Sequence, residues 1–279
     1  LATSPELYPE VVSFGGPELL LGLLAHENTD VGIAAVSLLA ELADPEIVLG
    51  DANADPDAAA EAAAAVAALV DAIADKQGLE LLVQNLGRLD ESNEEDAKGV
   101  QLTVQLLQNM VEVNPALGEA LAERTSLLRF LLKRVRGKKF DYNKLVCSEV
   151  LAQLLNSSAA VRAKLHHVQG TDGIDALLNA VAVYKRRDPT SEDEAMCIEN
   201  LFDALSAALL LLDNQDRFRK NEGIELMVRC LREKKFAAWP AIRVLDFACT
   251  NNKANCHRLV QAQGLGALCP MLMGRGAAR

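Results

Sequence analysis

The sequence predicts an all-α protein, a right-handed superhelix of stacked helical repeats. Half of its 279 residues are apolar but only 4% are aromatic, so Leu and Ala fill the core and helices are favoured over a β-sandwich or barrel. Apolar residues recur at helical spacing in nearly every segment, and no segment shows sustained period-two alternation. A short Leu-rich helix also returns several times along the chain, which is typical of a repeat protein.

The helices are justified by local signals in chain order. Pro17 stands in the first turn of the first one, and Val31, Ala35 and Leu39 show the helical spacing of the second. Pro56 follows Asp55 as N1 follows an N-cap. Helices are predicted over residues 17–24, 29–43, 56–74, 79–89, 94–113, 127–135, 142–155, 174–184, 192–212, 224–231 and 240–249.

The short Leu-rich helices define a repeat. Each follows a small residue, and the glycines among these fit tight turns between helices. The small residues are Gly16, Gly78, Ser126, Gly173, Gly223 and Gly264. The intervals between them are 62, 48, 47, 50 and 41 residues. A period near 40–47 residues is the armadillo/HEAT range. An Ala-rich insertion, residues 51–68, explains the long first interval. We therefore expect one armadillo-type domain over residues 1–279, with about five to six repeats and truncated at both ends, because only stacking buries each Leu stripe.

The third helix of an armadillo repeat presents a Trp and an Asn, four residues apart, to a concave groove. In this chain only Asn109 keeps the amide of that pair, and no position keeps the Trp. The register predicts charge contacts to a basic peptide from Glu41, Glu149 and Asp203, and main-chain contacts from Gln105, Asn109 and Gln153. The alternative is that the three acids are ordinary solvated charges.

The charge of the chain bears on its partners. There are 28 basic and 39 acidic residues, a net charge of −11, which disfavours direct binding of nucleic acid and suits basic partners. Three basic clusters, residues 133–139, 185–187 and 232–235, each follow a helix end, where cations are favourable. If they align on one ridge, RNA phosphate or an acidic partner could bind there. No apolar run is long enough for a membrane span.

Signals for chemistry are weak. The sequence has no phosphate-binding loop and no spaced metal-ligand motif, and the pairs His166–His167 and Cys256–His257 are helix neighbours that point apart. The six cysteines are scattered over helical segments, as reduced core thiols are. We expect no cofactor, no metal and no enzymatic activity. Trp239 is interpreted mainly as a packing residue, with a surface anchor as the alternative.

Several blocks carry a more specific likeness. The most distinctive are NKLVCSEVLAQLL at 143–155, LVQNLGRLDES at 82–92 and LREKK at 231–235. Further blocks lie, in order, at residues 26–44, 131–134, 173–179, 199–206, 217–235 and 255–257. With them the chain resembles the catenin-beta-like nuclear armadillo family, which is associated with splicing, across nearly its whole length. The Ala-rich insertion departs from the family pattern.

The resemblance implies a function. It implies a nuclear, non-enzymatic scaffold in pre-mRNA splicing that associates with the spliceosome-activating nineteen complex. Its partners would be splicing-complex proteins, bound through basic segments of the nuclear-localisation type, and self-association into a homo-oligomer is implied too. The alternative is a generic cytoplasmic armadillo adaptor in trafficking or ubiquitin ligation, which localisation and co-purifying partners would separate. An enzyme is a third possibility that no group of residues motivates.

Overall fold

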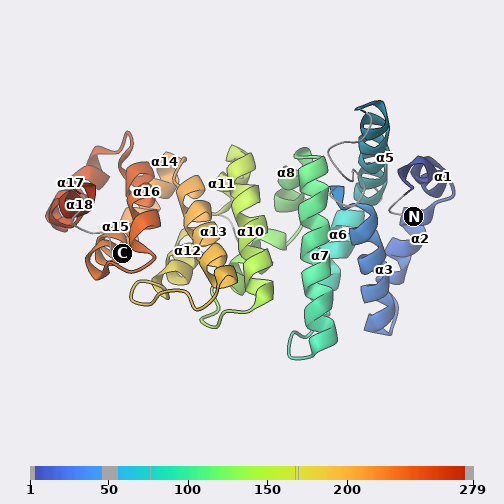
Figure 1. The fold of residues 1–279 in the computed structure, drawn as a ribbon, viewed down its shortest axis with the longest axis horizontal. Coiled ribbons are helices and arrows are strands. Elements are labelled where there is room, and N and C mark those ends of the chain that lie inside the picture. The colour runs from blue at the N-terminus through green and yellow to red at the C-terminus, as the bar shows by residue number, and fades with distance from the viewer. Residues whose placement is uncertain (1–3, 46–55, 76, 167, 169, 274–279) are drawn as a thin grey trace. The chain divides into compact units, whose positions relative to one another are not determined.

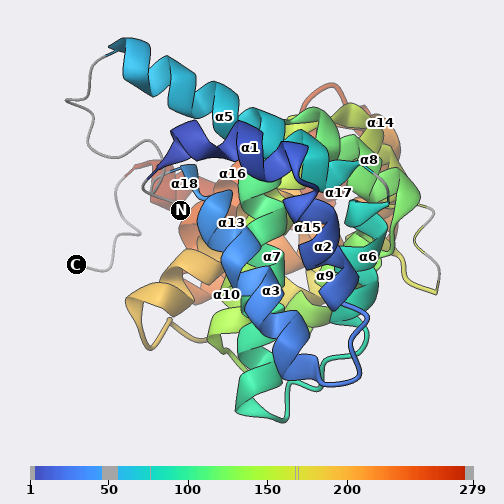
Figure 2. The same ribbon diagram turned by 90° about the vertical axis from the view of Figure 1, so that its right-hand side faces the viewer.

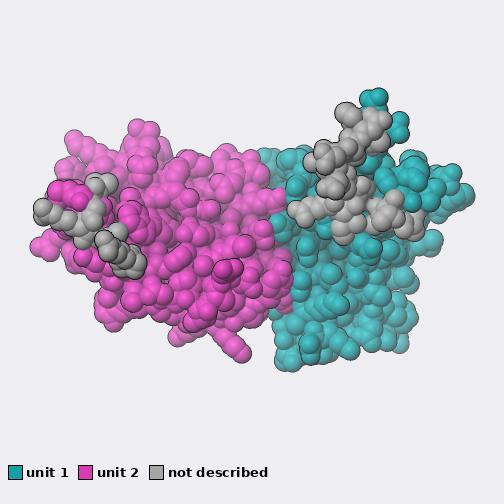
Figure 3. Space-filling model, in the orientation of Figure 1, with its two compact units in different colours: residues 1–127 teal, residues 128–279 magenta. Residues whose placement is uncertain are grey.

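The computed structural model describes residues 4–45, 56–75, 77–166, 168 and 170–273, and every regular element in these ranges is a helix (Figure 1). The chain divides into two compact units, which Figure 3 colours separately. Unit 1 comprises Leu1–Leu127 and unit 2 comprises Leu128–Arg279. A single continuous domain over the whole chain stays a prediction.

Unit 1 is built from helices that pack on their counterparts one repeat later. The third helices α3 and α7 form its most extensive contact, and the first helices α1 and α5 lie side by side (Figures 1 and 2). The elements of the unit are η1 (Pro5–Leu7), α1 (Tyr8–Ser13), α2 (Gly16–Leu23), α3 (Thr29–Leu42), α5 (Pro56–Ala74), α6 (Gly78–Leu86), α7 (Glu94–Val113) and α8 (Ala116–Arg124).

Unit 2 repeats the same plan. Its third helices α10, α13 and α16 pack in a row, and the second helices α12 and α15 each pack against the third helix of their own repeat and the next first helix (Figure 1). The elements of the unit are α9 (Leu127–Val135), α10 (Tyr142–Ser157), α11 (Ala159–Lys164), α12 (Gly173–Ala182), α13 (Glu192–Ala208), α14 (Leu212–Lys220), α15 (Gly223–Glu233), α16 (Ala238–Cys249), α17 (Lys253–Gln261) and α18 (Gly264–Leu272).

The predicted helices agree closely with the observed second and third helices of most repeats, and with the long first helix α5. The bounds of α5, α7 and α9 are those predicted. The first helices α1, α8, α11, α14 and α17 are missing from the prediction, because they have only 6–9 residues and little apolar surface. The prediction of one helix over 192–212 is wrong. Helix α13 ends at Ala208, and α14 starts at Leu212 after a bend of 117°.

A tight turn joins the first and second helices of most repeats. The second helices other than α9 begin at the predicted glycines. Each glycine lies against a side chain or carbonyl of the preceding helix or, for Gly173, of Leu165 just after that helix. A Cβ on Gly78 would lie 1.7 Å from the carbonyl oxygen of Ile73, and one on Gly223 would lie 2.4 Å from the ring of Phe218. The residue before each, Gln77 or Glu222, adopts a left-handed backbone, with φ of 66° and 59°. The predicted role in tight turns is confirmed for Gly16, Gly78, Gly223 and Gly264, whereas Gly173 begins α12 after a longer connection from α11.

Buried amides on the first helices tie successive repeats of unit 2 together. Asn214 Nδ2 on α14 donates to the carbonyls of Ala208 at 2.8 Å and Arg162 at 3.2 Å. One repeat later, Asn255 Nδ2 on α17 donates to Ala248 at 2.7 Å and Gln215 at 3.3 Å. Each amide therefore bonds one carbonyl at the end of a third helix and one of the previous first helix, and so links two successive repeats.

No single helix in the described ranges is long and apolar enough to cross a bilayer, and α13 with α14 meets that criterion only as a bent pair.

Candidate functional site

The third helices of unit 1 each present one exposed stripe. On α3 the stripe runs from Asp30 through Leu38 to Glu41. On α7 it follows the helical spacing of four and three residues and is rich in amides and acids: Glu94, Lys98, Gln101, Gln105, Gln108 and Glu112. Because α3 and α7 pack against each other, polar side chains from both helices are available to one ligand.

The three predicted residues of unit 1 differ in position. Glu41 is exposed at the end of α3, and Gln105 is half-buried on the α7 stripe. Asn109 is only 8% exposed, and its Nδ2 is buried without a hydrogen-bond partner in the described part of the chain. Asn109 therefore does not present its amide to solvent, because its position turns toward the packed side of α7. A main-chain contact from it would require the side chain to move.

Glu41 also influences the core beneath it. The hydroxyl of Tyr8 is buried and donates to the carbonyl of Leu42 at 3.0 Å. Burial, with the negative charge of Glu41 as a second cause, raises the pKa of Tyr8 to about 12. The carboxylate of Glu41 is therefore close enough to the Tyr8 hydroxyl to act on it electrostatically, while Glu41 itself is exposed.

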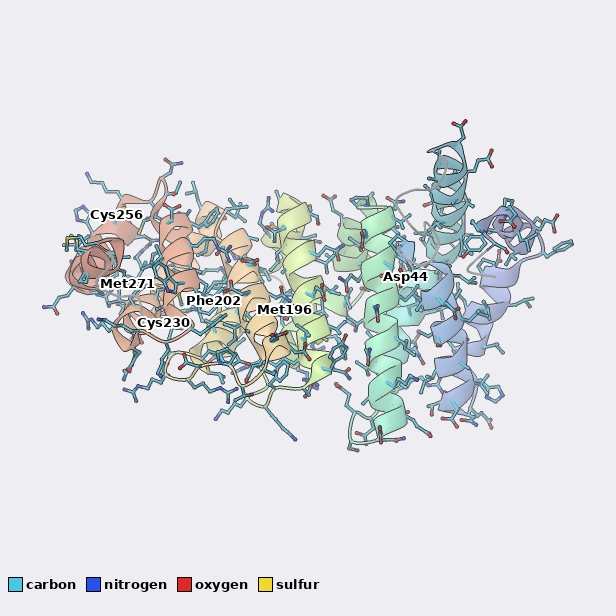
Figure 4. The ribbon with its side chains drawn as sticks, viewed as in Figure 1. Asp44, Met196, Phe202, Cys230, Cys256 and Met271 are labelled. Atoms are coloured by element: carbon cyan, nitrogen blue, oxygen red, sulfur yellow. The ribbon has the colours of Figure 1, made fainter. Side chains whose placement is uncertain are left out.

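Unit 2 presents a wider row of polar side chains on α10, α13 and α16. Helix α13 shows the two sides of such a helix in Figure 4: Met196 is 51% exposed, whereas Phe202 is fully buried. The exposed and half-buried positions of the row, which we call the unit 2 row, are Glu149, Gln153, Met196, Glu199, Asp203, Trp239, Arg243 and Asp246. The predicted residues Glu149, Gln153 and Asp203 all belong to it.

An arginine compensates the acids at one end of this row. Arg243 on α16 forms an ion pair with Asp203 on α13, and its guanidinium lies 3.9 Å from the carboxylate of Glu199. Asp203 is thus not an open carboxylate awaiting a basic ligand. The sequence held the signal for this pair, because the armadillo register places Arg243 one repeat after Asp203 on the same face.

Glu149 and Gln153 lie on α10, at the other side of the row. Both are half-buried, and Glu149 forms no ion pair with any residue described. The Oε1 of Gln153 is buried and lacks a hydrogen-bond partner within the described ranges. The amide oxygen of Gln153 therefore lacks a hydrogen bond. If the side chain turned outward, a backbone N–H of a bound segment could donate to this oxygen.

Trp239 lies at the start of α16, next to the buried Pro240. It is 57% exposed, so its interpretation as a packing residue is wrong and the surface alternative holds. Sequence reasoning missed it because a lone Trp in an apolar stretch usually packs inside. With Met196 it gives the unit 2 row an apolar surface that fits the aliphatic stem of a Lys or Arg.

Groups suited to metal binding or thiol chemistry are sparse. Within the described ranges no three His, Cys, Asp or Glu residues gather into a possible metal site. The six cysteines are free; Cys147, Cys197 and Cys230 are buried as core thiols should be, whereas Cys256 and Cys269 are exposed. The prediction of core thiols therefore does not hold for the last two.

Charge separates the two units sharply. Unit 1 contains 4 basic and 23 acidic residues, a net charge of −19. Unit 2 contains 24 basic and 16 acidic residues, a net charge of +8. The acidic character of the whole chain thus comes entirely from the unit that carries the α3 and α7 stripes.

A known structure shows the same fold. A crystal structure of an engineered protein has a TM-score of 0.52 to the chain at 19% identity, covering 97% of this chain and 67% of that one. At this identity the likeness shows the fold alone, an all-α solenoid of helical repeats as predicted. The handedness of the superhelix stays a prediction.

Curated relatives carry the assignment further. The chain is 44% identical over 276 residues to Beta-catenin-like protein 1 of Rattus norvegicus and 43% identical to that of Homo sapiens. It is 32% identical over 269 residues to the Beta-catenin-like protein 1 homolog of Schizosaccharomyces pombe. These matches cover 95–98% of this chain but 45–46% of the relatives, so the chain spans about half of their length. A family described as "Catenin-beta-like, Arm-motif containing nuclear" matches residues 1–279, and the chain belongs to this family.

Proposed function

We propose that the chain acts in the nucleus as a non-enzymatic scaffold in pre-mRNA splicing, within the spliceosome-associated nineteen complex. It captures basic segments of the nuclear-localisation type from splicing factors. The observation that carries the binding mode is the acid excess of unit 1, 23 acidic against 4 basic residues, around the exposed stripes of α3 and α7. The splicing role is supported by membership of the nuclear family.

The α3 and α7 stripes offer two kinds of contact. Exposed carboxylates, Glu41 on α3 and Glu112 on α7, attract Lys and Arg side chains over a distance of about a Debye length, ~8 Å at physiological salt. Between them on α7, the half-buried amides of Gln101, Gln105 and Gln108 each supply a donor and an acceptor. An extended basic segment needs both: charge partners for its side chains and amide partners for its main chain.

The unit 2 row supplies a weaker version of the same site. Glu149 is open, but Arg243 already pairs with Asp203 and lies near Glu199. Exposed Met196 and Trp239 add apolar surface for the stems of basic side chains. We therefore assign the main electrostatic capture to unit 1 and a side-chain packing role to unit 2.

The binding mode is tested with a fluorescent Lys/Arg-rich peptide and fluorescence anisotropy at several salt concentrations. Glu41→Lys with Glu112→Lys should weaken binding about tenfold or more, because two attractions become repulsions worth roughly 0.5–1 kcal/mol each. The matched control is Glu10→Lys with Glu61→Lys, which makes the same charge change on the exposed surface of α1 and α5. Equal losses in both variants would show general attraction and defeat the site.

The splicing role is tested by pull-down from nuclear extract at low and moderate salt, with mass spectrometry as the readout. Recovery of nineteen-complex components with the wild-type chain, and their loss with the Glu41/Glu112 variant, is the expected result. Recovery of trafficking or ubiquitin-ligase proteins instead, from whole-cell extract, would favour the cytoplasmic adaptor over the splicing scaffold.

A further inference from the structure

The three basic clusters of unit 2 occupy equivalent places in successive repeats. They lie at the connections between second and third helices: α9 to α10, α12 to α13 and α15 to α16. The first two of these connections run along the lower edge of the unit in Figure 1. We call the whole set the basic edge, which comprises Lys133, Arg136, Lys138, Lys139, Lys185, Arg186, Arg187, Arg232, Lys234 and Lys235.

Direct contacts join the second and third clusters. Arg186 Nε lies 2.8 Å from a carboxylate oxygen of Glu233, at the end of α15. In the opposite direction, Lys235 Nζ lies 2.9 Å from Asp188, which also accepts the backbone N–H of Phe236 at 2.9 Å. These bonds cross between the two connections, so the cations around them share one surface.

A buried lysine joins the first and second clusters. Lys144 is fully buried at the start of α10, and its Nζ donates to the carbonyl of Gly137, within the first cluster, at 2.6 Å. The same ammonium lies 5.3 Å from the ring centre of Tyr184, and the guanidinium of Arg187 lies 5.0 Å from that ring. The path Gly137–Lys144–Tyr184–Arg187 therefore holds the first connection against the second, and the basic edge is continuous.

Most of the first cluster is uncompensated. Lys133, Arg136, Lys138 and Lys139 are exposed, and no carboxylate of the described residues forms an ion pair with them. The helix macrodipole accounts for Lys133 in the last turn of α9. It does not account for Lys138 and Lys139, which follow the end of α9 at Val135 by three and four residues, because the effect fades beyond the last turn.

The composition of the basic edge indicates the kind of partner. Six of its ten residues are Lys, which protein–protein interfaces avoid. Two aromatic side chains are exposed beside the basic edge: Tyr142, 51% exposed at the first residue of α10, and Trp239, 57% exposed at the second residue of α16, four residues after Lys235. Many cations beside open aromatic rings suit a phosphate backbone with stacked bases better than an acidic protein.

We propose that the basic edge binds single-stranded RNA, through its phosphates and without sequence preference. The net charge of −11 argues against this only for the chain as a whole, because unit 2 alone carries +8. At physiological salt, charges more than about 8 Å apart are largely screened, so the local excess decides binding. This inference does not depend on the capture of basic peptides by unit 1.

The test uses a fluorescein-labelled oligouridine and the full chain, with affinity measured between about 50 and 200 mM salt. Each neutralised phosphate contributes about −0.7 to the slope of log K against log salt, so about five contacts give a slope near −3.5. Lys138→Gln with Lys139→Gln should reduce the steepness by about 1.4 and weaken binding at low salt about tenfold. Tyr142→Ala should weaken binding with no change of slope, since stacking releases no counterions.

The matched control is Lys220→Gln with Lys253→Gln. It removes two exposed lysines from α14 and α17, outside the basic edge, and should leave both slope and affinity unchanged. Equal effects of the two double variants would overturn the proposal, and so would absence of binding at about 50 mM salt. A poly-glutamate peptide of the same charge that competes as well as unlabelled oligouridine would overturn it too, in favour of an acidic protein partner. Circular dichroism confirms that each variant is folded.

Discussion

Unit 1 and unit 2 are built by the same device and carry opposite charge. In both, a glycine begins the second helix and lies against the first, as Gly78 does on Ile73 and Gly223 does on Phe218. Yet unit 1 has a net charge of −19 and unit 2 of +8. The comparison shows that turn and core residues specify a repeat, while the exposed positions are free to differ and to define separate binding surfaces.

The units also differ in how they treat the exposed face of their third helices. On α3 and α7, Glu41 and Glu112 face solvent with no ion pair among the described residues. On α13 and α16, Arg243 closes on Asp203. The exposed face of a third helix therefore holds open charges in one unit and an internal ion pair in the other, so a place on that face does not by itself make a charge available to a ligand.

The largest effect we expect comes from breaking what the units share. Gly78→Ala in unit 1 and Gly223→Ala in unit 2 should each destabilise the protein by at least about 2 kcal/mol, because the added Cβ overlaps neighbouring atoms. Thermal unfolding followed by circular dichroism measures the loss. The control is Gly22→Ala in α2, where a Cβ meets nothing within 4 Å and the better helix former should stabilise slightly. If Gly78→Ala behaved like Gly22→Ala, the close turn would not define the repeat.

A smaller effect should come from the charge that unit 2 buries. Burial lowers the pKa of Lys144 below its usual value of 10.5. Above this lowered pKa and up to about 10.4 the unfolded chain binds more protons than the native one, so stability rises with pH there. Lys144→Met removes both the buried charge and the titration, and it should change stability by no more than about 1 kcal/mol at neutral pH.

The measurement compares urea unfolding of the wild type and Lys144→Met at about pH 7 and about pH 10. Relative to the variant, the wild type should gain stability at the higher pH. Burial raises the pKa of Cys197 and of Tyr184, but both are present in the two proteins, so their effects largely cancel in the difference. Lys139→Met, which removes a lysine at an exposed position, is the matched control. A pH-independent difference for Lys144→Met would contradict the lowered pKa.

Much of the fold could be predicted from the sequence because its signals are local. Helix α7 was bounded by its acidic first turn and its apolar spacing, and the glycines marked the turns. The first helices were not predictable in this way. Helix α14 has only nine residues, and Phe218 is its only buried apolar side chain. Its place is fixed by Asn214, whose hydrogen bonds reach residues 6 and 52 positions away.

The candidate site was predicted less well, for a physical reason. Helical register tells which face a residue is on, and it placed Glu41, Gln105 and Glu149 on exposed stripes. Register does not tell how far neighbouring helices bury a residue on that face, or which side chain of a neighbouring helix lies beside it. Asn109 is buried and Asp203 is paired because of neighbouring helices, which a single helix cannot reveal. Contacts with neighbouring helices therefore decide which polar side chains on the face remain available to a ligand.

The smallest effect sharpens that last contrast. Arg243→Gln should leave Glu199 and Asp203 without their cation and so make the unit 2 row resemble the stripes of unit 1. Binding of the Lys/Arg-rich peptide should become about two- to fivefold tighter, because Arg243 would no longer compete with the peptide for the two carboxylates in an exposed ion pair. Arg219→Gln, which breaks the pair with Asp216 on α14, makes the same change in net charge away from the row and should have little effect. Unchanged affinity in Arg243→Gln would mean that basic segments contact unit 1 alone, and that the ion pair between α13 and α16 serves only to join two repeats.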